Sequence, residues 1–448
     1  MTYNYTVTSH ADDLREKLRD KTAKIGVVGL GYVGLPFLVE KAKVGFHVTG
    51  FDRNADRAAQ VSRGENYIRD VDDRDLERLV GEGFVSATAD FDRLAEMDII
   101  VICVPTPLDH NLTPDLSYVS SVTREIAQRL RPGQLISLES TTYPGTTNEV
   151  MKPLLEAGGL RAGQDFFLAH SPERVDPGNK RYTTKNTNKV VGADDSASLD
   201  VAVAFYQQAI DHIVAVSSTS AAELVKVYEN TFRSVNIALA NEIALLCDRM
   251  GLDVWEILDA AFTKPFGIMP FYPGPGVGGH CIPIDPHYLE WKAREYNFQT
   301  RFIALAGEIN RKMPEFVVDK AARVLNLDKK ALNGSTVLLL GMAYKSNLDD
   351  YRESPALHIY QLLEAAGASM LFHDSWTPHI QDRERGLDLR GVPLSDEVLS
   401  KADLVIIATQ HSDVDYERVL KLARRVLDTR NATKGLPAAL RTEKVTLL

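Results

Sequence analysis

The feature that most constrains the fold is a glycine pattern near the start of the chain. In the run KIGVVGLGYVGLP at 24–36, Gly29, Gly31 and Gly34 have the spacing G-x-G-x-x-G. The residues before them predict a buried strand, and those after them predict a helix. Glycine lets the backbone approach a pyrophosphate at the N-terminus of such a helix. The pattern predicts a dinucleotide site, although glycines can also serve only to make a tight turn.

The next apolar segment ends at Asp52, where a carboxylate can accept hydrogen bonds from a ribose. The same charge would repel a 2′-phosphate, so NAD is favoured over NADP, while the neighbouring Arg53 leaves NADP as the alternative. Thr106 and Thr141 follow later strands, at the edge where open sheets bind ligands. Threonines in loops are more often local caps, so only their position makes these two candidates.

Strands separated by helical segments indicate parallel βαβ winding in the first half of the chain. A third and a fourth apolar strand are predicted at 98–107 and 135–147, and the remaining strands at 165–215. The last third repeats this pattern, because 335–345 is again a strand followed by a turn. It lacks the glycine pattern and carries an insertion at 344–355, so we expect it to bind something other than a dinucleotide.

Between the two repeats, a helical pattern runs from about 220 to 250 and ends before Gly251. A helix of this length predicts surplus apolar surface and a candidate dimer interface. The predicted fold class is α/β, with two Rossmann-like doubly wound domains joined by a central helical segment with one long helix. The expected domains are an NAD-binding domain at 1–215, a central helical domain at 216–315 and a second Rossmann-like domain at 316–448.

Composition narrows the class of protein. The net charge of −10 argues against nucleic acid as the main partner, because phosphate backbones need a basic surface. No apolar run approaches the roughly 18 residues of a membrane span, and the segment before Lys24 has no signal-peptide core. Three cysteines are too few for a disulfide framework. These features predict a cytoplasmic enzyme with neither a membrane partner nor a nucleic-acid partner.

One cysteine differs from the other two. Cys281 lies beside His280 in the glycine-rich segment at 271–286, where a reactive thiolate is expected. Cys103 and Cys247 lie in apolar segments and are predicted to be core residues. The alternatives for Cys281 are a buried structural thiol or part of a metal site. A metal needs three or four ligands, which no other Cys/His cluster supplies, so no metal is expected.

Four polar residues are candidate partners of this cysteine. Lys226 and Asn230 are four residues apart and share one face of the long helix, although such pairs are usually solvated. Asp285 precedes a proline and a predicted helix, so it can be an N-cap as readily as a catalytic group. Glu173 lies in a turn-rich segment, which alone proves nothing.

Together these motifs resemble the UDP-glucose/UDP-mannose-type nucleotide-sugar 6-dehydrogenases. The similarity runs in the family's order from about residue 24 to 431. It is closest to the branch acting on UDP-N-acetylhexosamines, especially the UDP-N-acetylglucosamine 6-dehydrogenases of bacterial surface-polysaccharide pathways. The motifs that carry it are GLGYVGLP, CVPTP, STTYPGTT, SPERVDPG, K-x-x-x-N, GPGVGGHCIPIDP and GMAYKSNLDDYRESP.

The resemblance implies an NAD-dependent four-electron oxidation of a primary alcohol to a carboxylate. The thiolate of Cys281 would add to the intermediate aldehyde, and a second oxidation would give a thioester that water releases. Lys226 would stabilise oxyanions, Asn230 and Asp285 would hold or activate water, and Glu173 would assist proton transfer or hydrolysis.

The resemblance also assigns binding residues. The predicted NAD contacts are Gly29, Gly31, Tyr32, Val33, Gly34, Asp52, Arg57, Thr106, Thr141 and Arg352. The predicted substrate contacts are Glu173, Arg174, Lys226, Asn230, Tyr272, Gly274, Gly278, Tyr344, Lys345 and Arg430. The expected partners are a UDP-sugar and a second copy of the chain, forming a homodimer or higher homo-oligomer through the central helix.

Two departures from the family and two other functions stay open. The UDP-glucose branch has a second acidic residue where Pro177 stands here, and an arginine upstream of the glycine loop, where this chain offers only Lys264. The hydrolytic step is therefore underdetermined. Within the same chemistry, the sugar could be UDP-glucose or UDP-N-acetylmannosamine. A two-electron β-hydroxyacid dehydrogenase would have no use for Cys281, and a binding module would need no nucleophile.

Overall fold

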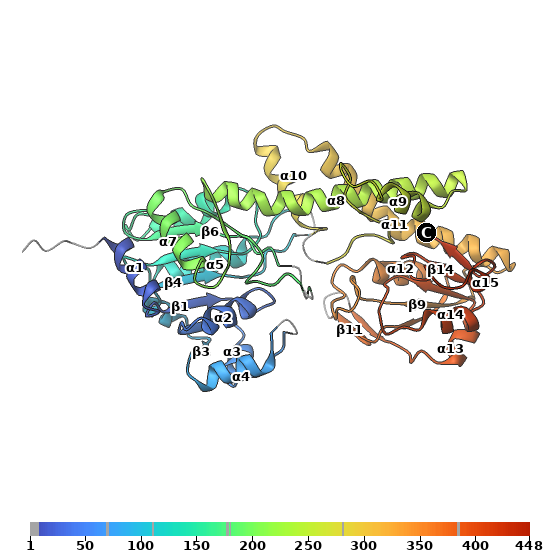
Figure 1. Cartoon of the computed structure of the whole chain (residues 1–448), viewed down its shortest axis with the longest axis horizontal. Coiled ribbons are helices and arrows are strands. Elements are labelled where there is room, and N and C mark those ends of the chain that lie inside the picture. Colours follow the sequence, from blue (N-terminus) through green and yellow to red (C-terminus); the bar gives the residue numbers. More distant parts are fainter. Residues whose placement is uncertain are drawn as a thin grey trace, which may run out of the picture. The chain divides into compact units, whose positions relative to one another are not determined.

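The computed structural model describes residues 9–68, 71–109, 112–175, 179, 181–279, 282–382 and 386–448 (Figure 1). The chain forms two compact units. The first comprises Met1–Glu229 with Trp291–Phe298, and the second comprises Asn230–Glu290 with Gln299–Leu448. None of the described helices is long and apolar enough to cross a membrane.

The first unit is built on an eight-stranded sheet with the order β3-β2-β1-β4-β5-β6-β7-β8. All neighbouring strands are parallel except β6 and β7, which are antiparallel. The direction of winding reverses between β1 and β4, which is where open sheets bind ligands. The strands are β1 (Ile25–Val28), β2 (Val48–Phe51), β3 (Val85–Thr88), β4 (Ile99–Ile102), β5 (Leu135–Leu138), β6 (Phe167–His170), β7 (Lys189–Gly192) and β8 (Ile213–Val216).

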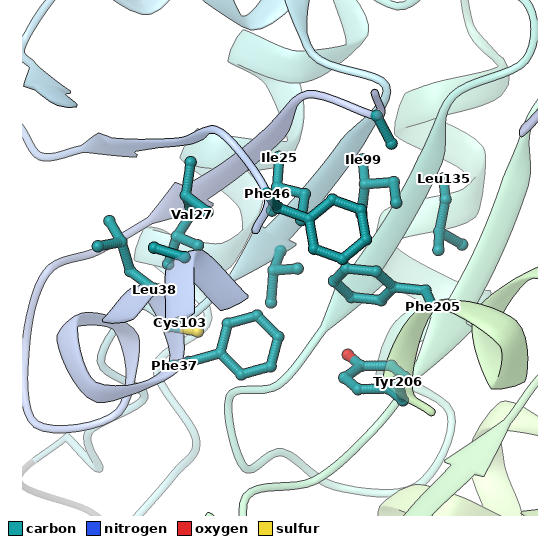
Figure 2. Close-up of a cluster of buried hydrophobic side chains, with 14 of the residues drawn as sticks. Ile25, Val27, Phe37, Leu38, Phe46, Ile99, Cys103, Leu135, Phe205 and Tyr206 are labelled. Atoms are coloured by element: carbon teal, nitrogen blue, oxygen red, sulfur yellow. The ribbon is translucent and has the colours of Figure 1, made fainter. Parts of the chain in front are cut away.

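Helices cover both faces of this sheet, as alternate residues of β4 show. Ile99 and Val101 pack on one face, and Ile100 and Ile102 pack on the other. The first face is covered by α1 (His10–Arg19), α2 (Gly34–Lys43), α4 (Asp73–Gly81) and α7 (Ser196–Tyr206), and the second by α5 (Ser117–Ala127) and α6 (Lys152–Glu156). Figure 2 shows the first of these cores, where aromatic rings from α2 and α7 meet the strands. The doubly wound α/β fold is confirmed.

Strand β3 is absent from the sequence-based prediction, which placed the third strand at 98–107. Only Val85 of its four residues is buried, so the segment shows no apolar run. The prediction therefore counted β4 as the third strand. A short edge strand carries too weak a pattern to be found from its residues alone.

The second unit contains a five-stranded parallel sheet with the order β10-β9-β13-β14-β15. Its strands are β9 (Thr336–Leu340), β10 (Ser369–His373), β13 (Leu404–Ile407), β14 (Val426–Asp428) and β15 (Val445–Leu447). A separate hairpin pairs β11 (His379–Asp382) with β12 (Leu387–Arg390). The helices around them are α9 (Val254–Ala261), α11 (Arg301–Leu327), α12 (Pro355–Ala365), α13 (Asp396–Lys401), α14 (Tyr416–Leu422) and α15 (Ala438–Arg441), while α10 (Asp285–Glu295) contributes residues to both units. In the first unit, one more helix, α3 (Ala55–Ser62), follows β2.

Helix α8 (Thr219–Met250) has 32 residues and contributes to both units. It ends before Gly251, whose φ of 71° lies in the left-handed region that glycine adopts at helix ends. At 1.5 Å per residue the helix is about 48 Å long. Several of its large apolar side chains are exposed, namely Leu224, Tyr228, Phe232, Leu239, Leu246 and Met250.

The same kind of close backbone contact occurs in each sheet, directly after its first strand in the chain. A side chain at Gly29, after β1, would lie 2.5 Å from the carbonyl oxygen of Cys103. A side chain at Gly341, after β9, would lie 2.4 Å from that of Thr409. Both glycines have positive φ, so each turn needs glycine for space and for conformation. The internal repeat predicted from the sequence therefore extends to this turn.

Candidate active site

The three glycines of the dinucleotide motif have different surroundings. A side chain at Gly34 would lie 1.8 Å from the carbonyl oxygen of Gly29, so the start of α2 packs directly against the end of β1. At Gly31, by contrast, a side chain would meet no atom within 4 Å. Packing therefore requires Gly29 and Gly34 but not Gly31. The open space at Gly31 fits a ligand that approaches the backbone closely.

The N-terminus of α2 suits an anion. Its N-cap residue, Val33, has no side chain that bonds to the first N–H groups, which are the groups that bind phosphate at such positions. The neighbouring Tyr32 is 47% exposed. These features fit the pyrophosphate of a dinucleotide.

Asp52 stands directly after β2 and is held by the backbone. One carboxylate oxygen accepts from the N–H of Leu30 at 3.1 Å, and the other from that of Asn54 at 2.9 Å. Arg57 donates to Asp52 at 3.3 Å and lies over the ring of Tyr67. The guanidinium of Arg53, which left NADP as the alternative, donates to the hydroxyl of Ser121. Asp52 is thus fixed at the edge where a ribose would bind.

Thr106 and Thr141 lie together after β4 and β5. The hydroxyl of Thr106 donates to the backbone carbonyl of Thr141 at 2.7 Å. The loop that carries Thr141 is tied to α8 by Glu223, which accepts from the N–H groups of Gly145 at 2.6 Å and Thr147 at 2.8 Å. Burial of Glu223 raises its pKa to about 7. The two threonines are therefore neighbours, and the hydroxyl of Thr106 helps to hold the loop that carries Thr141.

Glu173 is the centre of a buried charged cluster in the first unit. One carboxylate oxygen accepts from the N–H groups of Arg174 at 2.8 Å and Val175 at 2.7 Å. The other accepts from Lys189 at 3.1 Å, and Lys189 also donates to Glu139 at 2.9 Å. Burial acts to raise the pKa of Glu173, but Lys189 and the backbone N–H of Val175 outweigh it and leave that pKa below its ordinary value.

Two further predicted residues lie in the same unit. Lys226 is partly buried on α8 and has no ion-pair partner among the residues that the structure describes, and its charge also lowers the pKa of Glu173. The guanidinium of Arg174 donates to Glu229 at 2.5 Å and to the carbonyl of Asn188 at 2.6 Å. Lys226 is therefore the more available cation.

In the second unit, Asn230 and Asp285 are joined. The side-chain amide of Asn230 donates to the carboxylate of Asp285 at 2.5 Å, and both residues are buried. This bond ties α8 to the start of α10, four residues after Cys281 in the sequence. Cys281 and His280 lie outside the described residues, as does Pro177.

The other two cysteines are free thiols in the core. Cys103 lies directly after β4, and burial raises the pKa of its thiol well above the ordinary value. Cys247 is buried on α8. Across the described ranges, no group of three or more His, Cys, Asp or Glu side chains could hold a metal ion.

The glycine loop at 274–279 packs within the second unit. A side chain at Gly274 would lie 2.5 Å from the guanidinium of Arg430, and one at Gly278 would lie 2.7 Å from Tyr344. Gly274 is also held by the side chain of Asn241, which accepts from its N–H at 2.9 Å. The loop therefore packs closely against two other predicted substrate residues, Tyr344 and Arg430.

A cavity of about 460 Å³ lies beside this loop. Lys345, Arg430 and Lys434 make part of its wall basic, and burial lowers the pKa of Arg430 to about 10. Tyr272 stacks on Trp255 with ring centres 5.7 Å apart. The lining residues are Trp255, Asp259, Tyr272, Pro273, Tyr344, Lys345, Ser346, Thr409, Gln410, Arg430, Asn431 and Lys434. Such a wall suits a nucleotide with a charged diphosphate.

Comparison with known proteins decides the family. The chain matches the NAD binding domain, the central domain and the UDP binding domain of the UDP-glucose/GDP-mannose dehydrogenase family over residues 23–210, 220–312 and 338–435. The chain belongs to this family. It is an NAD-dependent UDP-sugar dehydrogenase, as the resemblance implied.

Similar proteins carry two substrate names. The chain is 34% identical to the UDP-N-acetyl-D-mannosamine dehydrogenase of Pyrococcus horikoshii, covering 92% of this chain and 97% of the relative. It is also 34% identical to the UDP-N-acetyl-D-glucosamine 6-dehydrogenase of Pseudomonas aeruginosa, covering 90% and 95%. A solved structure of the Pyrococcus horikoshii UDP-D-ManNAc dehydrogenase has a TM-score of 0.84 at 33% identity, covering 92% of this chain and 97% of that one.

Several residues of this dehydrogenase escaped the sequence-based prediction. Lys189 and Glu139 were missed because a lysine at the start of a strand and a glutamate after one carry no motif. Asn241, buried on α8, was hidden in an apolar stretch. Arg352 pairs with Asp350 at 2.6 Å, and its proposed contact with NAD stays a prediction. The contacts of Lys189, Glu139 and Asn241 become visible only in the folded structure.

The glycine turn gives a direct test of cofactor binding. Gly31→Ala places a methyl group in open space, so the free energy of unfolding should change by less than about 1 kcal/mol while NAD affinity falls about tenfold or more. Calorimetric titration with NAD and urea unfolding measure the two effects. In the control Gly34→Ala, the new methyl group would collide with Gly29, so that variant should lose stability. Unchanged NAD affinity in Gly31→Ala would contradict this assignment.

Proposed function

We propose that this dehydrogenase oxidises the C6 alcohol of a UDP-N-acetylhexosamine, UDP-N-acetylglucosamine in the first place, to the uronic acid. The observation that supports this proposal most directly is the buried hydrogen bond between Asn230 and Asp285. It joins the long helix to the start of α10, which follows Cys281 in the sequence, and so brings two predicted catalytic residues together. The product would be a precursor of a surface polysaccharide.

The reaction needs two molecules of NAD, each of which accepts one hydride when bound. Carbon C6 first loses a hydride and its hydroxyl group loses a proton, giving an aldehyde. The thiolate of Cys281 adds to that carbon, and the oxygen takes up a proton, giving a thiohemiacetal. Loss of a second hydride and the hydroxyl proton gives a thioester. Water then adds to the thioester carbon and loses a proton, and the carbon–sulfur bond breaks to regenerate the thiolate. The acid that forms loses a second proton and leaves as the carboxylate.

Each candidate residue has a role in this scheme. Lys226, a cation without an ion-pair partner in the described part of the chain, would stabilise the oxyanions. Asn230 and Asp285, already bonded to one another, would hold water. Glu173 would accept or return protons during hydrolysis. Since Pro177 replaces the second acidic residue of the UDP-glucose branch, Glu173 would act without it.

The two nucleotide sites divide between the units. Asp52 and Arg57 would bind the adenosine ribose of NAD, with Thr106 and Thr141 nearby and Arg352 as a further contact. In the second unit, Tyr344, Lys345 and Arg430 would hold the UDP portion in the basic cavity, with Tyr272, Gly274 and Gly278 beside them. The three-domain division at 215/216 and 315/316 remains part of this proposal.

Counting NADH tests the covalent route. With a UDP-sugar substrate, the wild-type enzyme should release two NADH for each sugar consumed, and Cys281→Ser should form no acid while binding NAD normally. Absorbance and anion-exchange chromatography measure NADH and acid. The matched control is Cys247→Ser, because Cys247 is a buried core thiol. One NADH per sugar would indicate a two-electron dehydrogenase, and none with any UDP-sugar would indicate a binding module.

The sugar is tested by NADH release across UDP-N-acetylglucosamine, UDP-N-acetylmannosamine, UDP-N-acetylgalactosamine and UDP-glucose. We expect the highest kcat/KM with UDP-N-acetylglucosamine, because the motifs at 171–178 and 263–286 resemble those of the UDP-N-acetylglucosamine 6-dehydrogenases. A tenfold preference corresponds to about 1.4 kcal/mol of transition-state binding. Preference for the mannosamine sugar would instead match the relative from Pyrococcus horikoshii.

We also propose that α8 pairs with α8 of a second copy. Phe232, Leu239 and Leu246 are exposed at seven-residue spacing, the repeat that packs helix against helix. Leu239→Asp should convert a homodimer to a monomer in analytical ultracentrifugation, because it places a charge in the centre of this stripe. The control Arg233→Gln changes an exposed residue of the same helix that directly follows Phe232 and therefore lies on another face. A monomeric wild-type protein would contradict the proposal.

A further inference from the structure

Lys189 occupies an unusual place in the sheet. Strand β7 is antiparallel to β6, and the pairing of His170 with Gly192 is the only register between them. Continued by one residue at a time, this register sets Lys189 opposite Glu173. The hydroxyl of Ser171 donates to the carbonyl of Val190 at 2.8 Å, in agreement with this continuation. The reversed strand thus presents a lysine to the segment that follows β6.

The lysine is fixed between two carboxylates. Its side chain is 4% exposed, and it donates to Glu173 at 3.1 Å and to Glu139 at 2.9 Å. The side chain of Glu139 is fully buried, and its second oxygen has no hydrogen-bond partner among the described residues. Glu173 retains 16% exposure, so it alone of the three can reach a bound molecule. The cluster therefore leads from the core to an accessible carboxylate.

The surroundings make this arrangement specific to Lys189. A second buried lysine, Lys41, lies in the same core but donates to the carbonyl of Phe205 at 2.7 Å. Burial lowers the pKa of Lys41 well below its ordinary value, whereas the two carboxylates raise the pKa of Lys189 against the effect of burial. Lys189 therefore carries the positive charge of this cluster.

We propose that Lys189, anchored by Glu139, is a positioning residue that keeps Glu173 ionised and oriented as the general base of thioester hydrolysis. This inference rests on the proposed function. In the step concerned, the Glu173 carboxylate takes a proton from the water that attacks the thioester carbon. The carbon–sulfur bond then breaks, and the electron pair returns to the Cys281 sulfur as thiolate.

The geometry explains why a cation is needed. A carboxylate with so little exposure would hold a proton at neutral pH unless a charge opposed burial, and a protonated acid cannot accept a proton from water. The oxygen that faces Arg174 and Val175 is occupied by two N–H groups. Lys189 fixes the other oxygen, so rotation of the carboxylate is prevented as well.

Other ionisable groups act on this site from neighbouring elements. Lys226 on α8 adds a second positive charge that favours the ionised Glu173. Glu139 after β5 and the thiol of Cys103 after β4 are coupled to Glu173, and both have raised pKa values, mainly through burial. Removal of Lys189 would leave Lys226 as the cation that acts on Glu173, together with Glu139, whose negative charge would disfavour that of Glu173.

The test is the pH profile of acid release in a single turnover, with the full-length enzyme, NAD and the UDP-sugar that the panel selects. Wild-type activity should rise with pH as Glu173 ionises. Lys189→Met should move this rise to higher pH by about one unit or more. At pH values below the rise, the rate of acid release should therefore fall about tenfold. Lys189→Arg should restore the wild-type profile. The matched control is Lys41→Met, a buried lysine that does not contact Glu173, which should leave the profile in place.

Two outcomes would overturn the inference: an unshifted profile in Lys189→Met, or the same shift in Lys41→Met. If Lys189→Met does not fold, Glu139→Gln replaces it, because it keeps an oxygen for Lys189 and removes a competing negative charge. Its profile should move to lower pH, and an upward shift or none would contradict the proposal. Glu173→Gln separates the two claims: wild-type acid release in that variant would refute the role of Glu173 itself, whatever Lys189 does.

Discussion

In each sheet, the turn after the first strand depends on a close backbone contact that only glycine permits. Where β1 ends, Gly29 lies against the carbonyl of Cys103, and Gly34 lies against the carbonyl of Gly29. This contact brings the N-terminus of α2 to the edge of the sheet and leaves the space at Gly31 open. The same contact recurs between Gly341 and Thr409. The shape of each turn, beside which we propose that a nucleotide binds, therefore follows from how closely two backbone segments can approach.

The two sheets diverge at the next carboxylate. Asp52 accepts from the N–H of Leu30, and its counterpart Asp374 accepts from that of Met342. Asp374 also bonds to the ring of His411 at 3.1 Å and is fully buried. Since the other ring nitrogen of His411 accepts from the N–H of Asn347, this histidine holds the insertion in place. The carboxylate that would meet a ribose in one domain has become structural in the other.

The sequence was sufficient where a residue's role depends on its own segment. The glycine turn, Asp52, the long helix and the repeat follow from local patterns. The packing of Gly274 against Arg430 joins two residues that the resemblance assigns to substrate binding. It was insufficient for β3, whose four residues are mostly half-buried. It also failed for Lys189 and Glu139, which are 50 residues apart and meet only through the strand order. Contacts between residues so far apart produce no fixed spacing in the sequence from which they could be predicted.

The reversal of β7 relative to β6 explains why those two residues matter. In a wholly parallel sheet, the start of β7 would lie at the edge opposite the carboxyl end of β6. Because β7 runs antiparallel, its first residue instead lies beside the segment after β6, and Arg174 reaches the carbonyl of Asn188 one step further along. A buried lysine is costly unless it is paired. Here the topology supplies two carboxylates to it, and one of them, Glu173, remains partly exposed.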